Sequence, residues 1–156
     1  MNISLLVLVP LLPLASFLLL GLFGRKYIGN FSGIIGTLSL AVSAVISLLT
    51  AYNYFFSFGK AGDTYTAVIP LQFTWLKFSE TLSINMGILL DPISVMMIVV
   101  VTFVSLMVHI YSLGYMKGEE RYATYYSFLS LFTFSMLGLV LSTNIFQTYI
   151  FWELVG

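Results

Sequence analysis

The sequence predicts an all-α fold: a polytopic bundle of transmembrane helices with four complete spans, the start of a fifth, and a small extracytoplasmic β-hairpin loop. Two observations predict it. First, 60% of the 156 residues are hydrophobic and 8% are charged, with a mean hydropathy of +1.03, whereas soluble domains carry about 25% charged residues. Second, the apolar residues gather in runs of about 20, the length that crosses a hydrocarbon core about 30 Å thick. We therefore expect one multi-pass domain in a lipid bilayer, and place it in the bacterial inner membrane.

The first apolar run covers residues 3–23 and contains Pro10 and Pro13. The first charged residues, Arg25 and Lys26, follow this run, whereas a secretory signal peptide begins with basic residues and ends at a small-residue cleavage site. We interpret the run as a retained transmembrane helix that is kinked or broken near the prolines, because neighbouring helices can satisfy the freed backbone groups. Arg25 and Lys26 then begin a short connection to the next span.

Residues 31–58 carry no charged side chain and form the second predicted span. Small side chains along it let neighbouring helices approach closely; they are Ser32, Gly33, Gly36, Ser39 and Ser43. The end of the span is crowded with aromatic residues, which is typical of the boundary between membrane and water.

The longest polar stretch, residues 59–86, separates the second and third spans. Apolar and polar residues alternate in two short segments of it, residues 71–75 and 82–86, and a period of two residues predicts strands. We expect a hairpin that turns near Ser79 and Glu80 and serves as a structural lid. Four of the six basic residues lie in the other loops, so the positive-inside tendency places this stretch outside the cytoplasm.

Asp91 and Pro92 mark the start of the third helix. The Asp side chain can accept hydrogen bonds from the first free amides, and proline suits the first helical position. The third span then covers residues 92–113 and the fourth covers residues 123–142, with a loop of mixed charge between them. Helix capping alone explains Asp91, and a separate ionic role is the alternative.

The last predicted helix, residues 145–156, places one carboxylate inside an apolar run. If Asn144 caps this helix, Glu153 lies about 13 Å along it at 1.5 Å per residue, near the middle of a bilayer. An ionised acid there costs about 2.5 to 3.5 kcal/mol, and such residues usually mark ion or proton pathways. We interpret Glu153 as a candidate proton relay. The alternative is a protonated Glu that hydrogen-bonds a neighbouring helix.

The single histidine, His109, falls near the far end of the third span, about 27 Å along the helix from Asp91. A histidine there can titrate near neutral pH and pass protons. It can equally bond a serine or a carbonyl group at the interface between helices. His109 is therefore a second candidate proton relay.

The composition also excludes several kinds of site. Without cysteine and with one histidine, the sequence offers no disulfide, thiolate metal site, iron–sulfur cluster or haem site. The formal net charge is zero and the sequence has no long basic cluster. It therefore offers no basic surface of the kind that binds nucleic acid. We expect no cofactor-binding or metal-binding residue in this chain.

Five segments carry a resemblance to a known family, and they occur in the same order as in that family. They are Val9–Pro13, the hairpin loop, Leu90–Ser94, His109–Met116 and Phe151–Gly156. With them the sequence resembles the L subunits, or chain 5, of proton-pumping NADH:quinone oxidoreductase, which is respiratory complex I. The Asp-Pro-Ile-Ser start and the final Trp-Glu motif are fairly specific to such antiporter-like subunits, and residues 117–122 favour the L type. The A subunits of multisubunit sodium or potassium/proton antiporters are similar in the same regions and are the alternative.

The resemblance implies a proton-translocating membrane subunit, coupled to NADH oxidation and quinone reduction in other subunits. The chain would be part of an enzyme without redox catalysis of its own. NADH, FMN, iron–sulfur clusters and quinone would bind partner subunits, and the neighbours in the membrane would be other antiporter-like subunits.

The resemblance also implies that Glu153 forms a switchable ion pair with a lysine beyond Gly156. Only about twelve residues of the last helix are present, against about 20 needed to cross a bilayer. We therefore expect the chain to be a fragment of a larger multispan protein. A third hypothesis is a scaffold component in which Glu153 and His109 only join helices.

Overall fold

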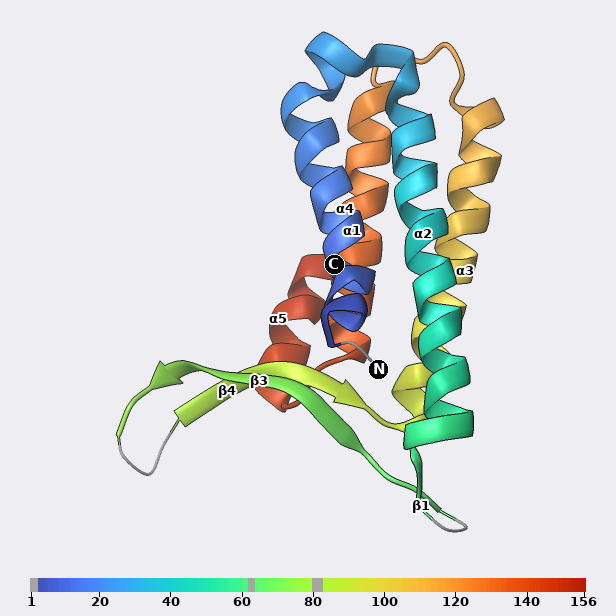
Figure 1. Cartoon of the computed structure of the whole chain (residues 1–156). Helices are drawn as coiled ribbons and strands as arrows, with labels where there is room; N and C mark the ends of the chain where they lie inside the picture. The colour runs from blue at the N-terminus through green and yellow to red at the C-terminus, as the bar shows by residue number, and fades with distance from the viewer. Residues whose placement is uncertain (1–2, 62–63, 80–82) are drawn as a thin grey trace.

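The computed structural model describes residues 3–61, 64–79 and 83–156. In this part of the chain, long helices stand side by side and a β-hairpin crosses beneath one end of them (Figure 1). The helices are α1 (Ile3–Leu19), α2 (Ser32–Asn53), α3 (Pro92–Tyr115), α4 (Tyr122–Val140) and the short α5 (Ile145–Val155). Among the described residues, four helices are long and apolar enough to cross a membrane, as the sequence predicted. Whether α5 belongs to a fifth span stays a prediction.

The first helix is longer than predicted. After Leu19 it continues as a π-helix, Leu20–Ile28, so Arg25 belongs to the helix and the predicted end at residue 23 is wrong. A glycine lets these extra turns pack against α4: a Cβ built at Gly24 would lie 3.0 Å from the Cβ of Ala123. The connection to α2 is a single 3₁₀ turn, Gly29–Phe31.

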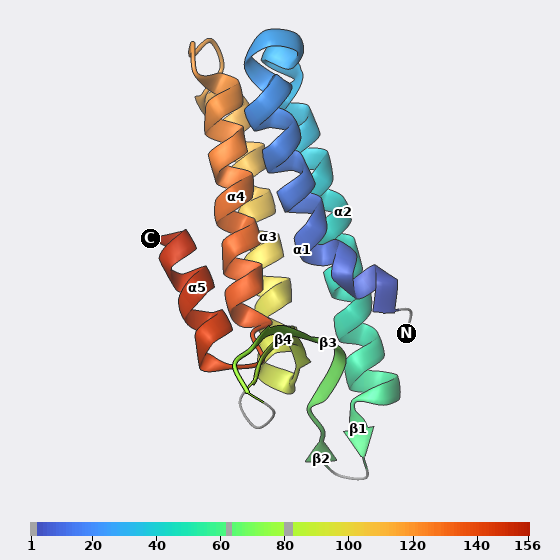
Figure 2. The same cartoon turned by 90° about the vertical axis from the view of Figure 1, so that its left-hand side faces the viewer.

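The prolines of α1 lie within one helix, whose N-terminal turns lean away from the rest of it (Figure 2). Proline has no amide hydrogen, so Pro13 leaves the carbonyl group of Val9 without its donor in the helix. Helix α2 supplies a donor, because Ser43 Oγ donates to Val9 O at 2.7 Å. Nearby, Ser39 Oγ donates to Leu12 O at 2.8 Å. A neighbouring helix therefore satisfies the freed backbone group, as predicted.

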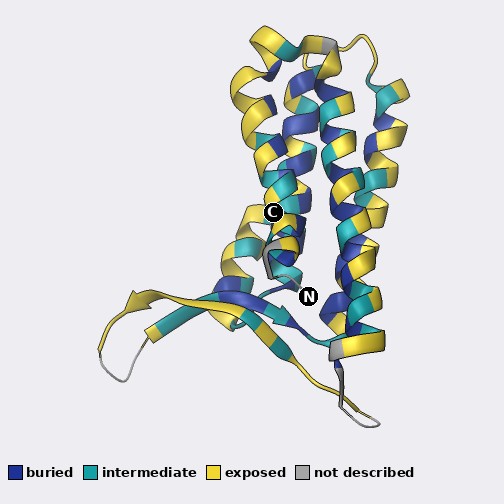
Figure 3. Ribbon diagram, viewed as in Figure 1, coloured by how far each residue is buried: buried dark blue, intermediate teal, exposed yellow. Residues whose placement is uncertain are grey.

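The four long helices pack around a hydroxyl-rich interior. Helix α1 packs against α2 and α4, and α3 packs against the same two helices. Among the described residues, four hydroxyl pairs bridge helices within the bundle: Ser47–Thr102 at 2.7 Å, Ser112–Tyr125 at 2.9 Å, Ser105–Thr133 at 3.0 Å and Ser16–Ser130 at 3.2 Å. Exposed residues follow the outer faces of the helices (Figure 3), and many are large and apolar, such as Leu22, Phe56 and Ile93. A polar interior with apolar outer faces suits a bundle whose surroundings are lipid.

An apolar core joins the helices to the hairpin. Its fully buried members come from α1, the segment after α2, the last strand, α3 and the end of α4; they are Leu6, Val9, Tyr54, Leu90, Val95, Ile98 and Leu137. Because strand and helix residues share this core, the hairpin is fixed to one end of the bundle.

The loop between α2 and α3 forms two antiparallel strand pairs. Strands β1 (Lys60–Ala61) and β2 (Thr64–Tyr65) make a short pair, and β3 (Val68–Lys77) pairs with β4 (Ser83–Leu90). The period-two prediction of strands is confirmed. The alternation does not mark a buried face on β3, which is exposed along nearly its whole length. Residues 80–82, where the predicted turn continues from Ser79, lie outside the described residues, and the extracytoplasmic placement stays a prediction.

Candidate functional site

The helix that carries Glu153 is anchored at its start to the hairpin. Asn144 caps α5, because its Oδ1 accepts from Gln147 N at 2.9 Å. The buried Gln147 side chain then binds both backbone groups of Gly87 in β4: Gly87 N donates to Oε1 at 3.0 Å, and Nε2 donates to Gly87 O at 2.9 Å. Asn144 Nδ2 also donates to the carbonyl group of Asn85. The predicted cap is confirmed, and the tether to β4 is a contact that the sequence did not indicate.

The orientation of α5 is fixed by one close contact with α4. A Cβ built on Gly138 would lie 2.4 Å from the Phe151 ring, so the ring covers the glycine directly. The Phe134 ring meets the same Phe151 ring edge-on, with centroids 5.6 Å apart. Glu153 follows two residues later, about 200° around the helix. Its side chain therefore points away from α4, and it is exposed.

The last turn of α5, which contains Glu153, lies at about half the height of the bundle (Figures 1 and 2). The described helices around it are apolar enough to cross a membrane. The depth of Glu153 in a bilayer stays a prediction. Because the side chain faces outward, it is available to a partner outside the described helices.

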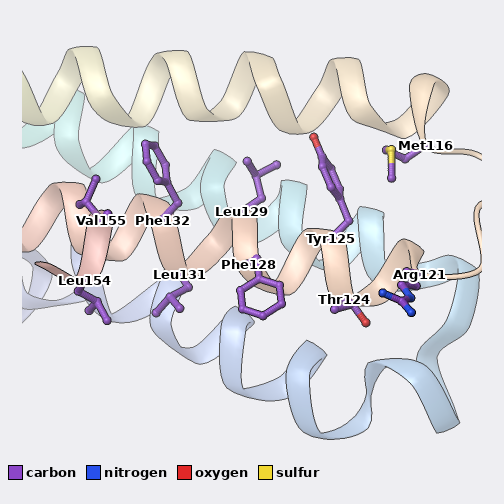
Figure 4. A pocket seen from close by; sticks show the side chains of 11 residues that line it. Met116, Arg121, Thr124, Tyr125, Phe128, Leu129, Leu131, Phe132, Leu154 and Val155 are labelled. Atoms are coloured by element: carbon purple, nitrogen blue, oxygen red, sulfur yellow. The ribbon is translucent and has the colours of Figure 1, made fainter.

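An open apolar groove of about 730 Å³ lies beside the end of α5. Figure 4 shows that the side chains around it come mainly from α4, with Leu154 and Val155 from α5. Arg121 is the only charged residue in the lining, and the rest is dominated by Phe128, Phe132 and leucines. This surface suits an apolar occupant such as a lipid chain or a helix, rather than a charged ligand.

Asp91 caps α3 as predicted. Ser94 N donates to Asp91 Oδ1 at 2.6 Å, and Asp91 N donates to Ser94 Oγ at 2.8 Å. The two residues form a reciprocal capping box at the junction between β4 and α3. Capping accounts for these two hydrogen bonds, and the separate ionic role of Asp91 stays a prediction.

His109 lies inside the bundle. It is fully buried, with Nδ1 2.8 Å from Ser105 O. The Tyr126 hydroxyl of α4 donates to His109 O at 2.8 Å, and the two rings lie 5.6 Å apart. The bond to Ser105 agrees with the alternative hypothesis for His109, a bond to a serine or a carbonyl group. Ser105 lies four residues before His109, the spacing at which a helical side chain reaches a carbonyl group. The contact with Tyr126 was not predicted.

The structure places the three predicted residues in three different environments. Asp91 and His109 stand about 27 Å apart along α3, and Glu153 faces outward from α5. They do not form one site. Among the described residues, no group of three or more histidine or carboxylate side chains is arranged to hold a metal ion. The candidate site is therefore a single carboxylate on a rigidly docked helix.

Comparison with known proteins shows which family this chain resembles. Residues 75–126 match the family described as NADH-Ubiquinone oxidoreductase (complex I), chain 5 N-terminus. Over 156 residues the chain is 40% identical to NADH-quinone oxidoreductase subunit L of Neisseria meningitidis serogroup B (strain ATCC BAA-335 / MC58), a match that covers 99% of this chain and 22% of the relative. The chain is similar to complex I chain 5 proteins over nearly its whole length.

Chloroplast proteins show a comparable similarity to this chain. It is 37% identical to NAD(P)H-quinone oxidoreductase subunit 5 of Chara vulgaris over 96% of its own length and 22% of the relative. For the Anthoceros angustus protein of that name, the identity is 40%, over 95% of this chain and 20% of the relative. The chain thus spans about a fifth of the length of these relatives. The family match at residues 75–126 includes Asp91 and His109.

Proposed function

We propose that this chain is part of a proton-translocating membrane subunit of NADH:quinone oxidoreductase. The observation that carries the proposal is Glu153, a lone carboxylate at mid-height in an apolar bundle, in a chain similar to complex I chain 5 proteins. Ionisable residues at such depth are costly and usually serve transport. The relatives reported above are named as oxidoreductase subunits, which favours this function over the A subunit of a cation/proton antiporter.

In this proposal Glu153 takes up and releases protons as a cationic partner moves. An opposite charge within about 4 to 6 Å favours the ionised carboxylate, and withdrawal of that charge favours the protonated one. The partner is a lysine on another membrane helix. The outward face of α5 leaves Glu153 accessible to it, while the contacts of Phe151 and Gln147 hold the helix in place.

The redox chemistry belongs to other subunits. NADH, FMN, iron–sulfur clusters and quinone bind partner subunits, and this chain contributes the proton path without redox catalysis of its own. The partners in the membrane are other antiporter-like subunits. The membrane is the bacterial inner membrane, with the β3–β4 hairpin on its extracytoplasmic side. His109 is a further relay candidate inside the bundle, and Asp91 has mainly a capping role.

Purification tests the proposal. The full-length protein is tagged and isolated from its own membranes in mild detergent. We expect NADH:quinone reductase activity to co-purify with the tagged protein. When the purified material is reconstituted into proteoliposomes, addition of NADH and quinone should produce a pH difference across the membrane. Sodium or potassium/proton exchange without any response to NADH would contradict the proposal and favour the antiporter alternative.

A further inference from the structure

The hydrogen bond of His109 to its own helix fixes which ring nitrogen carries a proton. Nδ1 lies 2.8 Å from the carbonyl oxygen of Ser105, and a carbonyl oxygen can only accept. Nδ1 must therefore be the protonated nitrogen. In a neutral imidazole, Nε2 then carries a lone pair and needs a donor.

Nε2 of His109 and Oγ1 of Thr37 have no hydrogen-bond partner among the described residues, although both atoms are buried. They border the same part of the bundle. A Cβ built on Gly36, the residue before Thr37, would lie 3.5 Å from His109 Cδ2 and 3.1 Å from the Tyr126 ring. Cδ2 is the carbon bonded to Nε2, so this edge of the imidazole faces α2 next to Thr37.

Tyr126 interacts with both residues. Its hydroxyl donates to His109 O at 2.8 Å and neighbours the Thr37 hydroxyl. Polar groups from α2, α3 and α4 thus lie in the same region of the bundle: a histidine nitrogen that accepts, a threonine hydroxyl and a tyrosine hydroxyl. Buried polar groups in proteins are almost always satisfied by protein or by ordered water.

The surroundings disfavour a charged imidazole. The titratable groups near His109 on α4 are phenols, namely Tyr122, Tyr125 and Tyr126. The four candidate spans contain no Asp or Glu at all. An imidazolium would therefore be a buried charge without a counter-ion, which is costly. Neutral His109 needs only a hydrogen-bond donor at Nε2.

We propose that α2, α3 and α4 form an internal binding site for one water molecule. The water donates to His109 Nε2 and bonds Thr37 Oγ1, with the Tyr126 hydroxyl as a third partner. Buried waters typically make about three hydrogen bonds to groups that are otherwise unsatisfied. His109 acts here as a neutral acceptor that joins three helices through water. The site stands on this geometry and does not depend on the proposed function.

A structure of the full-length protein in its complex, at a resolution that shows ordered water, tests the site directly. We expect density within about 2.7 to 3.2 Å of His109 Nε2 and of Thr37 Oγ1. The Thr37→Val variant should lose this water. Thr133→Val is the matched control, because the Thr133 hydroxyl bonds Leu129 O and Ser105 Oγ and its loss should leave the water in place. A well-ordered His109 with no such density, where other internal waters are visible, overturns the proposal.

Nitrogen-15 NMR of the complex with labelled histidine gives a second readout. This chain has one histidine, and subtraction of the His109→Gln spectrum assigns its signals in the full-length protein. We expect a protonated Nδ1 and an unprotonated Nε2 whose shift shows an accepted hydrogen bond. In Thr37→Val that shift should move toward the value of an unbonded nitrogen. A protonated Nε2, or an Nε2 shift unaffected by Thr37→Val, contradicts the site.

Discussion

The Ser43 hydroxyl donates a 2.7 Å hydrogen bond to the carbonyl oxygen of Val9. In an uninterrupted helix that carbonyl would accept from the amide of residue 13, but residue 13 is proline. One side chain on α2 therefore supplies the hydrogen bond that α1 cannot make for itself.

The Ser43→Ala variant should be less stable by about 1 to 3 kcal/mol, because it leaves a buried carbonyl group unsatisfied. The Pro13→Ala variant restores an amide at residue 13 that can bind Val9 O. In that background Ser43→Ala should cost clearly less. Thermal unfolding of the unsubstituted protein, the two single variants and the double variant measures the difference. Equal costs of Ser43→Ala in both backgrounds would show that the hydroxyl does not replace the missing amide.

Gly138→Ala should displace α5 from α4. The added methyl group would lie 2.4 Å from the Phe151 ring, and overpacking of this kind costs about 1 to 3 kcal/mol. Gly114→Ala is the control, because a Cβ there meets nothing within 4 Å, and alanine favours a helix over glycine by about 1 kcal/mol. We expect a lower unfolding temperature for Gly138→Ala only. An unchanged unfolding temperature for Gly138→Ala would contradict the close docking of α5.

Gln147→Leu should loosen the hairpin from α5. Both backbone groups of Gly87 lose their partner, at about 1 to 3 kcal/mol for each buried group. Hydrogen exchange measures this locally, and the amide of Gly87 should exchange faster. Gln72→Leu is the control, because Gln72 lies opposite Gly87 in the strand register but its side chain is exposed. If the Gly87 amide exchanges as slowly in Gln147→Leu as in Gln72→Leu and the unsubstituted protein, the Gln147 side chain does not hold β4 in place.

Sequence alone predicted the four spans, the strands and both helix caps, because these depend on local patterns. Apolar runs reveal spans, and Asp91 and Asn144 are capping residues that act within one turn. Contacts between distant segments were not predictable. Nothing in the spacing shows that Gln147 binds Gly87, or that His109 is covered by Tyr126. The end of the first helix was also missed, since charge at Arg25 suggested a loop, whereas packing of Gly24 against α4 favours further helix.

The depth of Glu153 was predicted by counting residues from Asn144, and its orientation was not. The outward direction of the side chain depends on Phe151 packing over Gly138, a contact between two helices. This orientation is what makes Glu153 available to a partner helix, and it is the basis of the proposed relay.

The most direct test of this account is the number of protons translocated per NADH oxidised by the complex with Glu153→Gln. Glutamine keeps the size and polarity of the side chain but cannot release a proton. At normal assembly and in coupled proteoliposomes, we predict a ratio reduced severalfold, while Glu120→Gln, which alters an exposed loop residue, leaves it unchanged. A ratio for Glu153→Gln equal to that of the unsubstituted complex would contradict the role of Glu153 in proton transfer.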